Sequence, residues 1–520
     1  MTKARKITSR GWVAKAAMLG VLSGTSVGAM GVPPTFQEAI GTQLEEQAMA
    51  VQSTRDGGFI SVGYRRGQFN AGRDILVTKH NQYGIPQWER VLVGPGEEVA
   101  FNVRQTLDGG YAIAAESTSI AGLGTAVIKL TAAGGFVWAE MYQGAPLLGT
   151  PLVTAIEEMK NGDLVVVSRV ATGVASHDAT IIRVRANGVA LFSNRYHDAR
   201  YENNSLTGFT DVREWFDTAG VSRGLVISGY TERDANSVRE ATILRTDSAG
   251  LPLQYRVGFA PNTDAVATGI DSLMPLDWGM SLRLGNTVFG GAGSGFARFD
   301  SLLNVTSERQ YGTFLVSHAS IQERSPSTQI ILAGTYPAAG PIAGDEAALL
   351  NVDPAGNPIW ERIYGGAVPN LPGVENFNGV WPTLDGGLIA AGLTGTFGFG
   401  NGDLYLVKTD SGGVVDCLQK PVQPQSAPLQ IPFTDVQLTM GGIQHTPWQP
   451  NVIATVSQVQ ILCIRCPADF DGDGAVDIFD YDAFVAAFEA GLMSADFDGD
   501  GTVDFFDYDA YVVAFETPCP

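Results

Sequence analysis

Two runs of carboxylates near the carboxyl end carry the most distinctive chemistry in this sequence. Each run places Asp at positions 1, 3, 5, 9 and 12 of a twelve-residue stretch, with Gly at position 6. The first comprises Asp469, Asp471, Asp473, Asp477 and Asp480, and the second Asp496, Asp498, Asp500, Asp504 and Asp507. Oxygen ligands at these offsets can surround one hard cation, and the backbone carbonyls of Ala475 and Thr502 at position 7 would add to them.

This spacing is that of an EF-hand calcium loop, in which Gly474 or Gly501 permits the sharp turn. Five carboxylates suit a large, flexible coordination shell better than the octahedral shell of magnesium, so the sequence predicts two Ca2+ ions. The alternative is an acidic solvated loop, but such a loop has no reason to repeat all six positions.

The acidic residues are concentrated in the same region. The chain of 520 residues has 54 Asp plus Glu against 33 Lys plus Arg, a net charge of −21. Residues 466–520 contain 14 Asp or Glu and no Lys or Arg, so this stretch accounts for two-thirds of the imbalance. A surface of this sign repels phosphate backbones, and we expect no nucleic-acid partner.

A helix is predicted after each carboxylate loop. Apolar residues recur at i, i+3, i+4 and i+7 in Tyr481, Phe484, Val485 and Phe488, and again in Tyr508, Tyr511, Val512 and Phe515. No helix is predicted before the first loop, because Cys466-Pro467-Ala468 precedes it directly. Two loop–helix repeats with Asp at position 12 and no entering helix resemble a dockerin, over about 466–520.

The resemblance to dockerins implies calcium-dependent folding and docking onto a cohesin-type protein. Dockerins often have small hydroxyl residues at loop positions 10 and 11, whereas this chain has Ile478-Phe479 and Phe505-Phe506. Either the partner surface is more apolar or these side chains pack inside, and another surface protein is an open alternative for the partner.

The amino terminus predicts export. Lys3, Arg5, Lys6 and Arg10 precede an apolar run of small residues that ends near Ala29, which is the pattern of a signal peptide over 1–29. Ser and Gly dilute this short run, so it is a poor membrane span. We expect a secreted or cell-surface protein with no membrane span after cleavage.

The middle of the chain repeats one pattern: an apolar β-type run, a basic residue, and a turn that usually ends in Gly. Seven segments match, and their last residues are at 84, 134, 188, 250, 304, 356 and 413. Turns such as Asp108-Gly109-Gly110 precede these segments, and aromatic residues such as Trp138 follow them. Four antiparallel strands in roughly fifty residues make a propeller blade. The pattern resembles the delta-sixty type of bacterial secreted propeller repeat.

We therefore expect an all-β seven-bladed β-propeller over 37–420 and a small all-α EF-hand or dockerin-like domain over 466–520. The turn Asp residues are expected to accept backbone hydrogen bonds rather than to catalyse. The recurrent basic position has two interpretations, a ring that binds an anionic ligand or stems buried within the blades. It is occupied by Lys79, Lys129, Arg183, Arg245, Arg298 and Lys408.

Residues 421–465 are predicted to be a Pro-rich linker with extra strands, at 433–439 and 452–464, that complete the last blade or cap it. Four cysteines allow three pairings. We expect Cys466 to pair with Cys519 across the carboxyl-terminal module, which leaves Cys417 with Cys463. A redox or zinc role for the Cys463–Cys466 pair is the weaker alternative, since no second such pair occurs.

No catalytic residue is predicted, and none of the five histidines forms an H-E-x-x-H pattern. Our first hypothesis is a non-catalytic surface protein whose propeller is a binding or structural platform and whose calcium module anchors it to another protein. The alternative is a carbohydrate-active enzyme for polysaccharide degradation, a glycoside hydrolase or polysaccharide lyase, because dockerins usually accompany such enzymes. A calcium-tuned adhesion protein without a cohesin is a third hypothesis.

The charge pattern predicts that residues 466–520 are largely unfolded without calcium, because clustered carboxylates repel and the module has little core. Circular dichroism of this fragment should show helix only when calcium is present. Full helix content in the presence of a chelator would contradict the prediction.

Overall fold

The computed structural model describes most of the chain from residue 35 onward. The described ranges are 35–67, 72–94, 96–118, 124–143, 155–172, 176–201, 206–232, 238–259, 263–273, 276–289, 291–312, 314–324, 329–337, 344–365, 374–415, 417–464, 468–470, 476–492, 495, 497 and 502–516. The expected signal peptide at 1–29 lies outside them. Neither described helix combines the length and apolar character that crossing a membrane would require.

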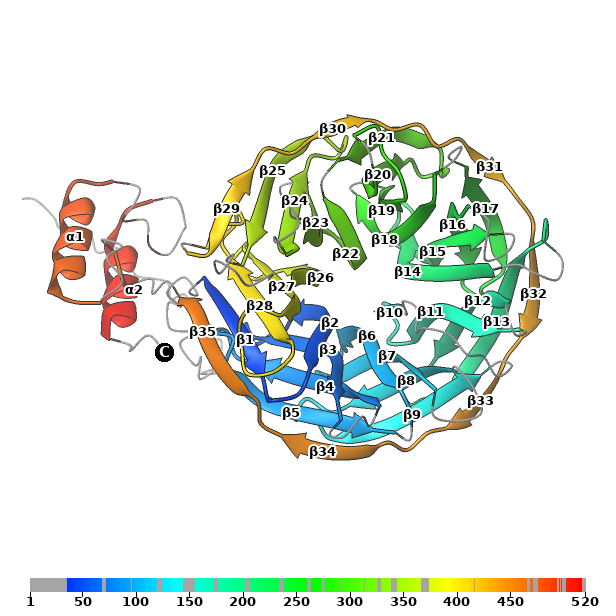
Figure 1. Cartoon of the computed structure of the whole chain (residues 1–520), viewed down its shortest axis with the longest axis horizontal. Coiled ribbons are helices and arrows are strands. Elements are labelled where there is room, and N and C mark those ends of the chain that lie inside the picture. The colour runs from blue at the N-terminus through cyan, green and yellow to red at the C-terminus, as the bar shows by residue number, and fades with distance from the viewer. Residues whose placement is uncertain are drawn as a thin grey trace, which may run out of the picture. The chain divides into compact units, whose positions relative to one another are not determined.

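The chain forms two compact parts, one with all the strands and one with both helices. The strands form a β-propeller, in which antiparallel four-stranded meanders stand around a common axis (Figure 1). The first strand of each meander is innermost and the fourth is outermost. The expectation of an all-β propeller followed by carboxyl-terminal helices is confirmed.

The meanders follow one another in chain order. The first contains β2 (Glu46–Ser53), β3 (Phe59–Arg66), β4 (Arg73–His80) and β5 (Pro86–Val93). The next contains β6 (Glu98–Gln105), β7 (Tyr111–Ser117), β8 (Gly124–Leu130) and β9 (Phe136–Gln143). Then come β10 (Ala155–Glu158), β11 (Leu164–Ala171), β12 (His177–Val184) and β13 (Ala190–Asp198). These are followed by β14 (Leu206–Phe216), β15 (Ser222–Glu232), β16 (Glu240–Asp247) and β17 (Pro252–Gly258).

The remaining meanders complete the ring. One contains β18 (Ala265–Leu273), β19 (Asp277–Leu284), β20 (Gly293–Phe299) and β21 (Val305–Tyr311). The next contains β22 (Leu315–Arg324), β23 (Gln329–Tyr336), β24 (Glu346–Val352) and β25 (Pro358–Tyr364). The last has β26 (Glu375–Pro382), β27 (Leu388–Thr394) and β28 (Asp403–Thr409), and takes its fourth strand, β1 (Phe36–Gly41), from the start of the propeller. Strands from both ends of the repeat region therefore hydrogen-bond to close the ring.

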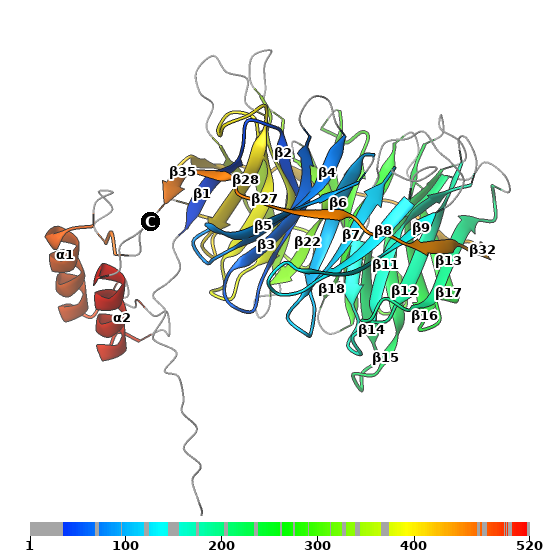
Figure 2. The ribbon, with the colours of Figure 1, turned by 90° about the horizontal axis from the view of Figure 1, so that it is seen from below.

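The segment that we expected to be a linker is instead a belt around the propeller. Its strands are β29 (Gln419–Val422), β30 (Ser426–Pro428), β31 (Phe433–Asp435), β32 (Leu438–Gly442), β33 (Gln444–Pro447), β34 (Asn451–Thr455) and β35 (Gln458–Ile464). They pair antiparallel, in this order, with β25, β21, β17, β13, β9, β5 and β1. The belt thus travels around the ring against the chain order (Figure 1; Figure 2).

From the sequence, we expected the strands of this segment either to complete the last blade or to cap it. Only β35 adds to the last meander, whereas each of the other six belt strands adds to a different one, and no cap is formed by the described residues. An outermost strand needs only one of its edges for pairing, so prolines such as Pro421 and Pro428 are tolerated within it. The proline content was therefore wrongly interpreted as a linker signal.

A disulfide joins the two ends of the belt. Cys417 and Cys463 are bonded, with their Cα atoms 6.0 Å apart and 46 residues between them in sequence. This expected pairing is confirmed, whereas Cys466 and Cys519 lie outside the described residues. Gln37 of β1 adds hydrogen bonds from its side-chain amide to the carbonyls of Cys417 and Leu418. The bond therefore ties the start of the belt to its end after one full circuit.

Hydrogen bonding divides the described strands into five sheets of five strands and one of ten. The ten-stranded sheet combines the meanders β10–β13 and β14–β17 with their belt strands. These two meanders are joined only by one parallel pairing, between His177 and Leu206.

The apolar core lies between neighbouring meanders. One cluster contains Ile60 and Val77 of the first meander, Ile113 and Ile128 of the second, and Trp448 of the belt. All five side chains are at most 5% exposed. A meander has two apolar faces, and only a neighbour on each side can bury both of them.

Contacts between meanders explain the aromatic and Gly positions of the sequence repeat. Gly134 has a φ of 74° and lies against Trp88 of the preceding meander, such that a Cβ at Gly134 would be 2.8 Å from the indole ring. Trp138 meets Gly188, and Trp360 meets Gly413, in the same way. Tyrosines of the outer strands add hydrogen bonds across the gap, as from the Tyr364 hydroxyl to the Gly413 carbonyl at 2.6 Å.

The carboxyl-terminal part contains α1 (Ile478–Glu489) and α2 (Phe505–Glu516), as the apolar spacing predicted. Its core is aromatic. Phe484 of α1 and Tyr511 of α2 are fully buried and stack with their ring centroids 3.9 Å apart. Phe497 packs edge-on against both rings.

The double substitution Cys417→Ser and Cys463→Ser should lower the free energy of unfolding of the propeller by roughly 3–4 kcal/mol, the entropy expected for closing a loop of this length. The belt should also become accessible to proteases, since its strands have only one paired edge. Urea unfolding and limited proteolysis under native conditions would measure both effects. An unchanged midpoint and cleavage pattern would show that strand pairing alone holds the belt.

Candidate functional site

The structure describes half of the predicted cation ligands. Asp469, Asp477, Asp480, Thr502, Asp504 and Asp507 lie within the described residues, and Asp471, Asp473, Ala475, Asp496, Asp498 and Asp500 lie outside them. Among the described residues alone, no group of three or more His, Cys, Asp or Glu is close enough to hold a metal ion. Within each loop, the structure brings together positions 9 and 12.

Positions 9 and 12 fix the start of each helix. Asp477 accepts a hydrogen bond from the Phe479 amide at 2.8 Å, and Asp480 accepts one from the Asp477 amide at 2.8 Å. This reciprocal pair is a capping box, which satisfies free N–H groups at a helix start. Asp504 and Asp507 repeat it, with the Asp507 bond at 2.7 Å.

Position 12 also closes the second loop on itself. Asp507 Oδ1 accepts a hydrogen bond of 2.6 Å from the backbone amide of Phe497, which is position 2 of the same loop. The carboxylate at the end of the loop is therefore held next to the residues at its beginning. This closure is what a loop needs if its first and last carboxylates are to share one cation.

The position-12 carboxylates are buried in a module without cationic side chains. Asp480 and Asp507 are each 1% exposed, and Asp469 at position 1 is 7% exposed. Buried carboxylates in proteins are normally compensated by a cationic side chain or a metal ion, but 466–520 contain no Lys or Arg. The donor set therefore fits a divalent cation, whose positive charge would offset the buried acid.

Loop positions 10 and 11 point to solvent rather than into the core. Ile478 and Phe479 are 59% and 65% exposed, and Phe505 and Phe506 are 71% and 65% exposed. Of the two possibilities left open by the sequence, internal packing is wrong for these four residues. Each repeat thus presents a large apolar pair at the amino end of its helix.

Most basic positions of the propeller repeat form ion pairs within their own meanders. Five of the six form ion pairs with an Asp at the start of the adjacent strand: Lys79–Asp56, Lys129–Asp108, Arg183–Asp163, Arg298–Asp277 and Lys408–Asp385, with N···O distances of 2.6–2.9 Å. Arg245 instead donates to the Ser301 carbonyl and lies over Trp215. The three lysines are at most 3% exposed, so the interpretation as buried stems is favoured over an anion-binding ring.

The turn Asp residues accept the backbone hydrogen bonds that their motif predicted. Asp108 accepts from the Gly110 amide at 2.9 Å and from Lys129 Nζ at 2.9 Å. Burial opposes ionisation of Asp108, but the hydrogen bonds from Thr106, Lys129 and Gly110 outweigh it and lower its pKa to about 2. Burial likewise opposes ionisation of Asp385, but the charge of Lys408 and the hydrogen bonds to Asp385 outweigh it and lower its pKa. These carboxylates are structural anions and not proton donors near neutral pH.

The innermost strands carry a second set of charges, which the sequence reasoning missed. Arg104 of β6 binds Glu157 of β10 at 3.2 Å, and Arg213 of β14 binds Asp271 of β18 at 3.1 Å. Asp211 accepts from Arg213 at 2.7 Å and from the Ile270 amide at 3.1 Å. The signal was present in the sequence, because the partners are separated by 53 and 58 residues, about one repeat.

Glu157, Asp211 and Asp271 are therefore already matched by arginines. Burial raises the pKa of Glu157, although Arg104 and Arg213 oppose the shift. Arg104 also lies over the Trp381 ring, 4.7 Å from its centroid, which ties β6 to β26. Carboxylates do converge near the axis, but each of Glu157, Asp211 and Asp271 serves as the counter-ion of an arginine.

Comparisons with known proteins add no family. No family profile matches the chain, and no curated protein matches it. Similar solved structures include a protein of unknown function from Dyadobacter fermentans, at 10% identity and TM-score 0.39 over 72% of this chain and 98% of that one. They also include the polysaccharide lyase Uly1, at 9% identity and TM-score 0.41 over 70% of this chain and 90% of that one. At these values neither protein lends its function to this chain.

The substitution Asp385→Asn should destabilise the propeller by about 2–4 kcal/mol, because it leaves the Lys408 ammonium buried without its anion. Thermal and urea unfolding would measure the change. The matched control is Asp217→Asn. Its ion-pair partner Arg223 is 54% exposed and stays solvated, so the unfolding midpoint of this variant should hardly change. Equal effects of the two substitutions would contradict the structural role of the buried pair.

Proposed function

We propose that this protein is an exported, calcium-binding surface protein, in which the propeller is a binding or structural platform and the carboxyl-terminal module is a protein–protein anchor. One observation carries the proposal. Two loops repeat the same six positions, and their position-12 carboxylates, Asp480 and Asp507, are buried in a module that has no cationic side chain. Two Ca2+ ions would supply the missing positive charge.

The anchoring role rests on what the two repeats expose. The apolar pairs Ile478-Phe479 and Phe505-Phe506 occupy the loop positions at which dockerins contact their partners, and all four are more than half exposed. A cohesin-type protein with an apolar contact surface is the partner that this chemistry favours. An adhesion role on another surface protein uses the same residues and would appear as binding without a cohesin.

We propose that the propeller has seven blades, on the grounds of how the meanders and the belt strands pair. The ten-stranded sheet comprises two blades, since β10–β13 and β14–β17 share a single parallel pairing and each has its own belt strand, β32 and β31. Counted in this way the propeller has seven blades of five strands. The repeat spacing of the sequence supports the same number.

A carbohydrate-active enzyme is the alternative function. It requires acidic residues free to act as acid, base or nucleophile at the axial mouth of the propeller. Three inner carboxylates, Glu157, Asp211 and Asp271, are held by Arg104 and Arg213, so these three do not favour it.

Titration of the full chain with CaCl2 in a calorimeter should show binding of two ions. The double substitution Asp480→Asn and Asp507→Asn should weaken that binding by at least about tenfold, because ligand charge sets the affinity of such loops. Asn can still accept the capping hydrogen bonds, so the helices keep their start.

The control for this titration is the double substitution Asp482→Asn and Asp509→Asn, which removes the same charge from exposed positions two residues further along each helix. It should retain both binding events. If the wild type gives no heat, or if both variants lose binding equally, the proposed calcium sites are wrong.

A further inference from the structure

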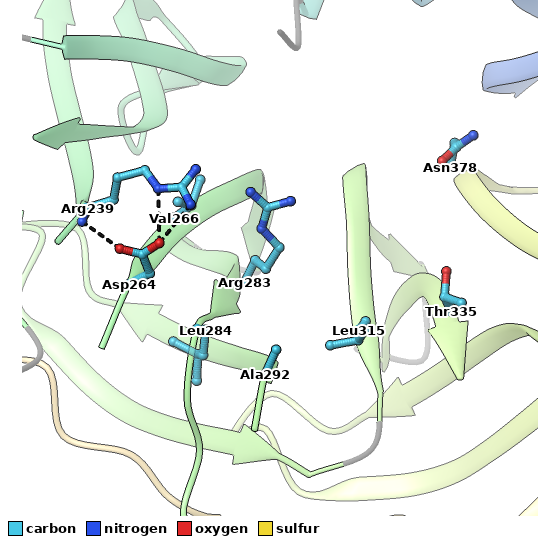
Figure 3. A pocket seen from close by; sticks show the side chains of 10 residues that line it. Arg239, Asp264, Val266, Arg283, Leu284, Ala292, Leu315, Thr335 and Asn378 are labelled. Carbon is cyan, nitrogen blue, oxygen red and sulfur yellow. Dashed lines mark hydrogen bonds and ion pairs between the residues drawn. The ribbon is translucent and has the colours of Figure 1, made fainter. Parts of the chain in front are cut away.

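A cavity of about 300 Å3 opens among the inner strands of the propeller. It is lined by Arg239, Asp264, Arg283, Leu315, Thr335 and Asn378 together with four further residues, and these come from four consecutive meanders (Figure 3). We call it the Arg283 cavity. It belongs to neither the carboxylate loops nor the ion pairs of the inner strands.

The Arg283 cavity lies at one axial end of the propeller. Asp264 immediately precedes β18, Arg283 is near the end of β19, and Leu315 and Thr335 stand at the start of β22 and near the end of β23. The opposite ends of such strand pairs are joined by tight turns, for example 217–221 between β14 and β15, which is held by a Gly220–Asp217 hydrogen bond.

Asp264 fixes one of the two arginines. Its Oδ2 is 2.7 Å from Arg239 Nη2 and 3.2 Å from Arg239 Nε, and its Oδ1 accepts from the Arg239 backbone amide at 2.9 Å. The hydrogen bonds of this carboxylate thus go to Arg239, although its charge also acts on Arg283. The ion pair of Arg239 and Asp264 forms one wall of the cavity.

Arg283 is different, because no described residue is its hydrogen-bond or ion-pair partner. Its guanidinium projects into the open space beside Arg239 (Figure 3). Burial, and then the nearby Arg239, lower the pKa of Arg283, and they outweigh the opposing influence of Asp264 and Tyr230. A bound anion would therefore stabilise the charged guanidinium. A guanidinium offers paired N–H donors in the geometry of a carboxylate.

The other walls suit the body of a small polar ligand. The Thr335 hydroxyl makes no hydrogen bond to a described residue, and Asn378 donates its side-chain N–H to the Ala48 carbonyl at 2.8 Å, which leaves its side-chain oxygen as an acceptor toward the cavity. Val266, Leu284 and Leu315 supply apolar surface between these groups. Polar groups at a few points on an apolar wall are typical of small-molecule sites.

We propose that the Arg283 cavity binds one acidic sugar ring, with its carboxylate on Arg283 and its hydroxyls on Thr335 and Asn378. One unmatched positive charge suits a monoanionic carboxylate better than a doubly charged phosphate. The volume lies at the lower end of small-molecule sites and accommodates one ring rather than an oligosaccharide. The inference extends the proposed platform role of the propeller by giving it a ligand class.

Calorimetry of the full chain with sodium glucuronate and sodium galacturonate tests the proposal. At least one of them should bind saturably, whereas glucose, which has the ring without the carboxylate, should bind at least about tenfold more weakly. Sodium acetate and inorganic phosphate should not compete at equal concentration. Equal binding of glucose, tighter binding of phosphate, or no binding of either uronate would overturn the assignment.

The substitution Arg283→Met should weaken uronate binding at least about tenfold, and Thr335→Val should reduce binding of the uronate with no effect on acetate. Arg223→Met is the matched control, because Arg223 is a half-exposed arginine beside the tight turn at 217–221. Circular dichroism and the thermal midpoint should be the same in all three variants and the wild type. Loss of uronate binding in Arg223→Met, or unchanged binding in Arg283→Met, would contradict the site.

The two proposals can fail separately. Arg283→Met should retain the full calcium heat, and the Asp480→Asn/Asp507→Asn variant should retain uronate binding. Calcium binding without uronate binding would refute the Arg283 cavity alone. Uronate binding without calcium binding would leave the cavity intact and refute the anchor module.

Discussion

Closure of the ring is the constraint on which the rest of the propeller depends. Each meander has two apolar faces and can bury them only between two neighbours, so an open ring would expose a complete face at each end. The chain closes it with hydrogen bonds between β1 and β28. The belt then passes around all the meanders and its ends are joined by the Cys417–Cys463 disulfide. The aromatic-to-Gly contacts and the buried Lys–Asp pairs need these neighbours in place.

Charge is used in opposite ways in the two parts of the protein. In the propeller, cations and anions are matched locally, as Lys408 with Asp385 and Arg104 with Glu157. In the carboxyl-terminal module, residues 466–520 supply no Lys or Arg to match the buried Asp480 and Asp507, which accept hydrogen bonds from backbone amides. The Arg283 cavity is the reverse case, since the half-buried Arg283 has no hydrogen-bond or ion-pair partner among the described residues. Each of the two candidate sites therefore holds an excess of charge of one sign.

Much of the fold could be predicted from the sequence because it is periodic. The residue types of Gly134, Trp88 and Lys129 recur at similar places in the repeats. Each of these positions makes one characteristic contact, either within its own meander or with the neighbouring one. The belt could not be predicted, because its strands are short, carry prolines and pair with partners far away in the sequence, such as Arg309 with Pro428 and Arg256 with Asp435. The helices followed from apolar spacing. Arg283 gave no signal, because its importance lies in which residues surround it in space.

The reverse path of the belt has a consequence for how the chain is made. The outermost strand of each meander would present a free hydrogen-bonding edge until the belt is laid against it, and such edges promote association between chains. The edge of β25 can be covered first, as β29 follows it by about fifty residues, whereas β5 must wait for β34 near the end of the sequence. The earliest-synthesised edges therefore stay uncovered longest. Protection of a nascent chain against aggregation would be needed most at its oldest strands.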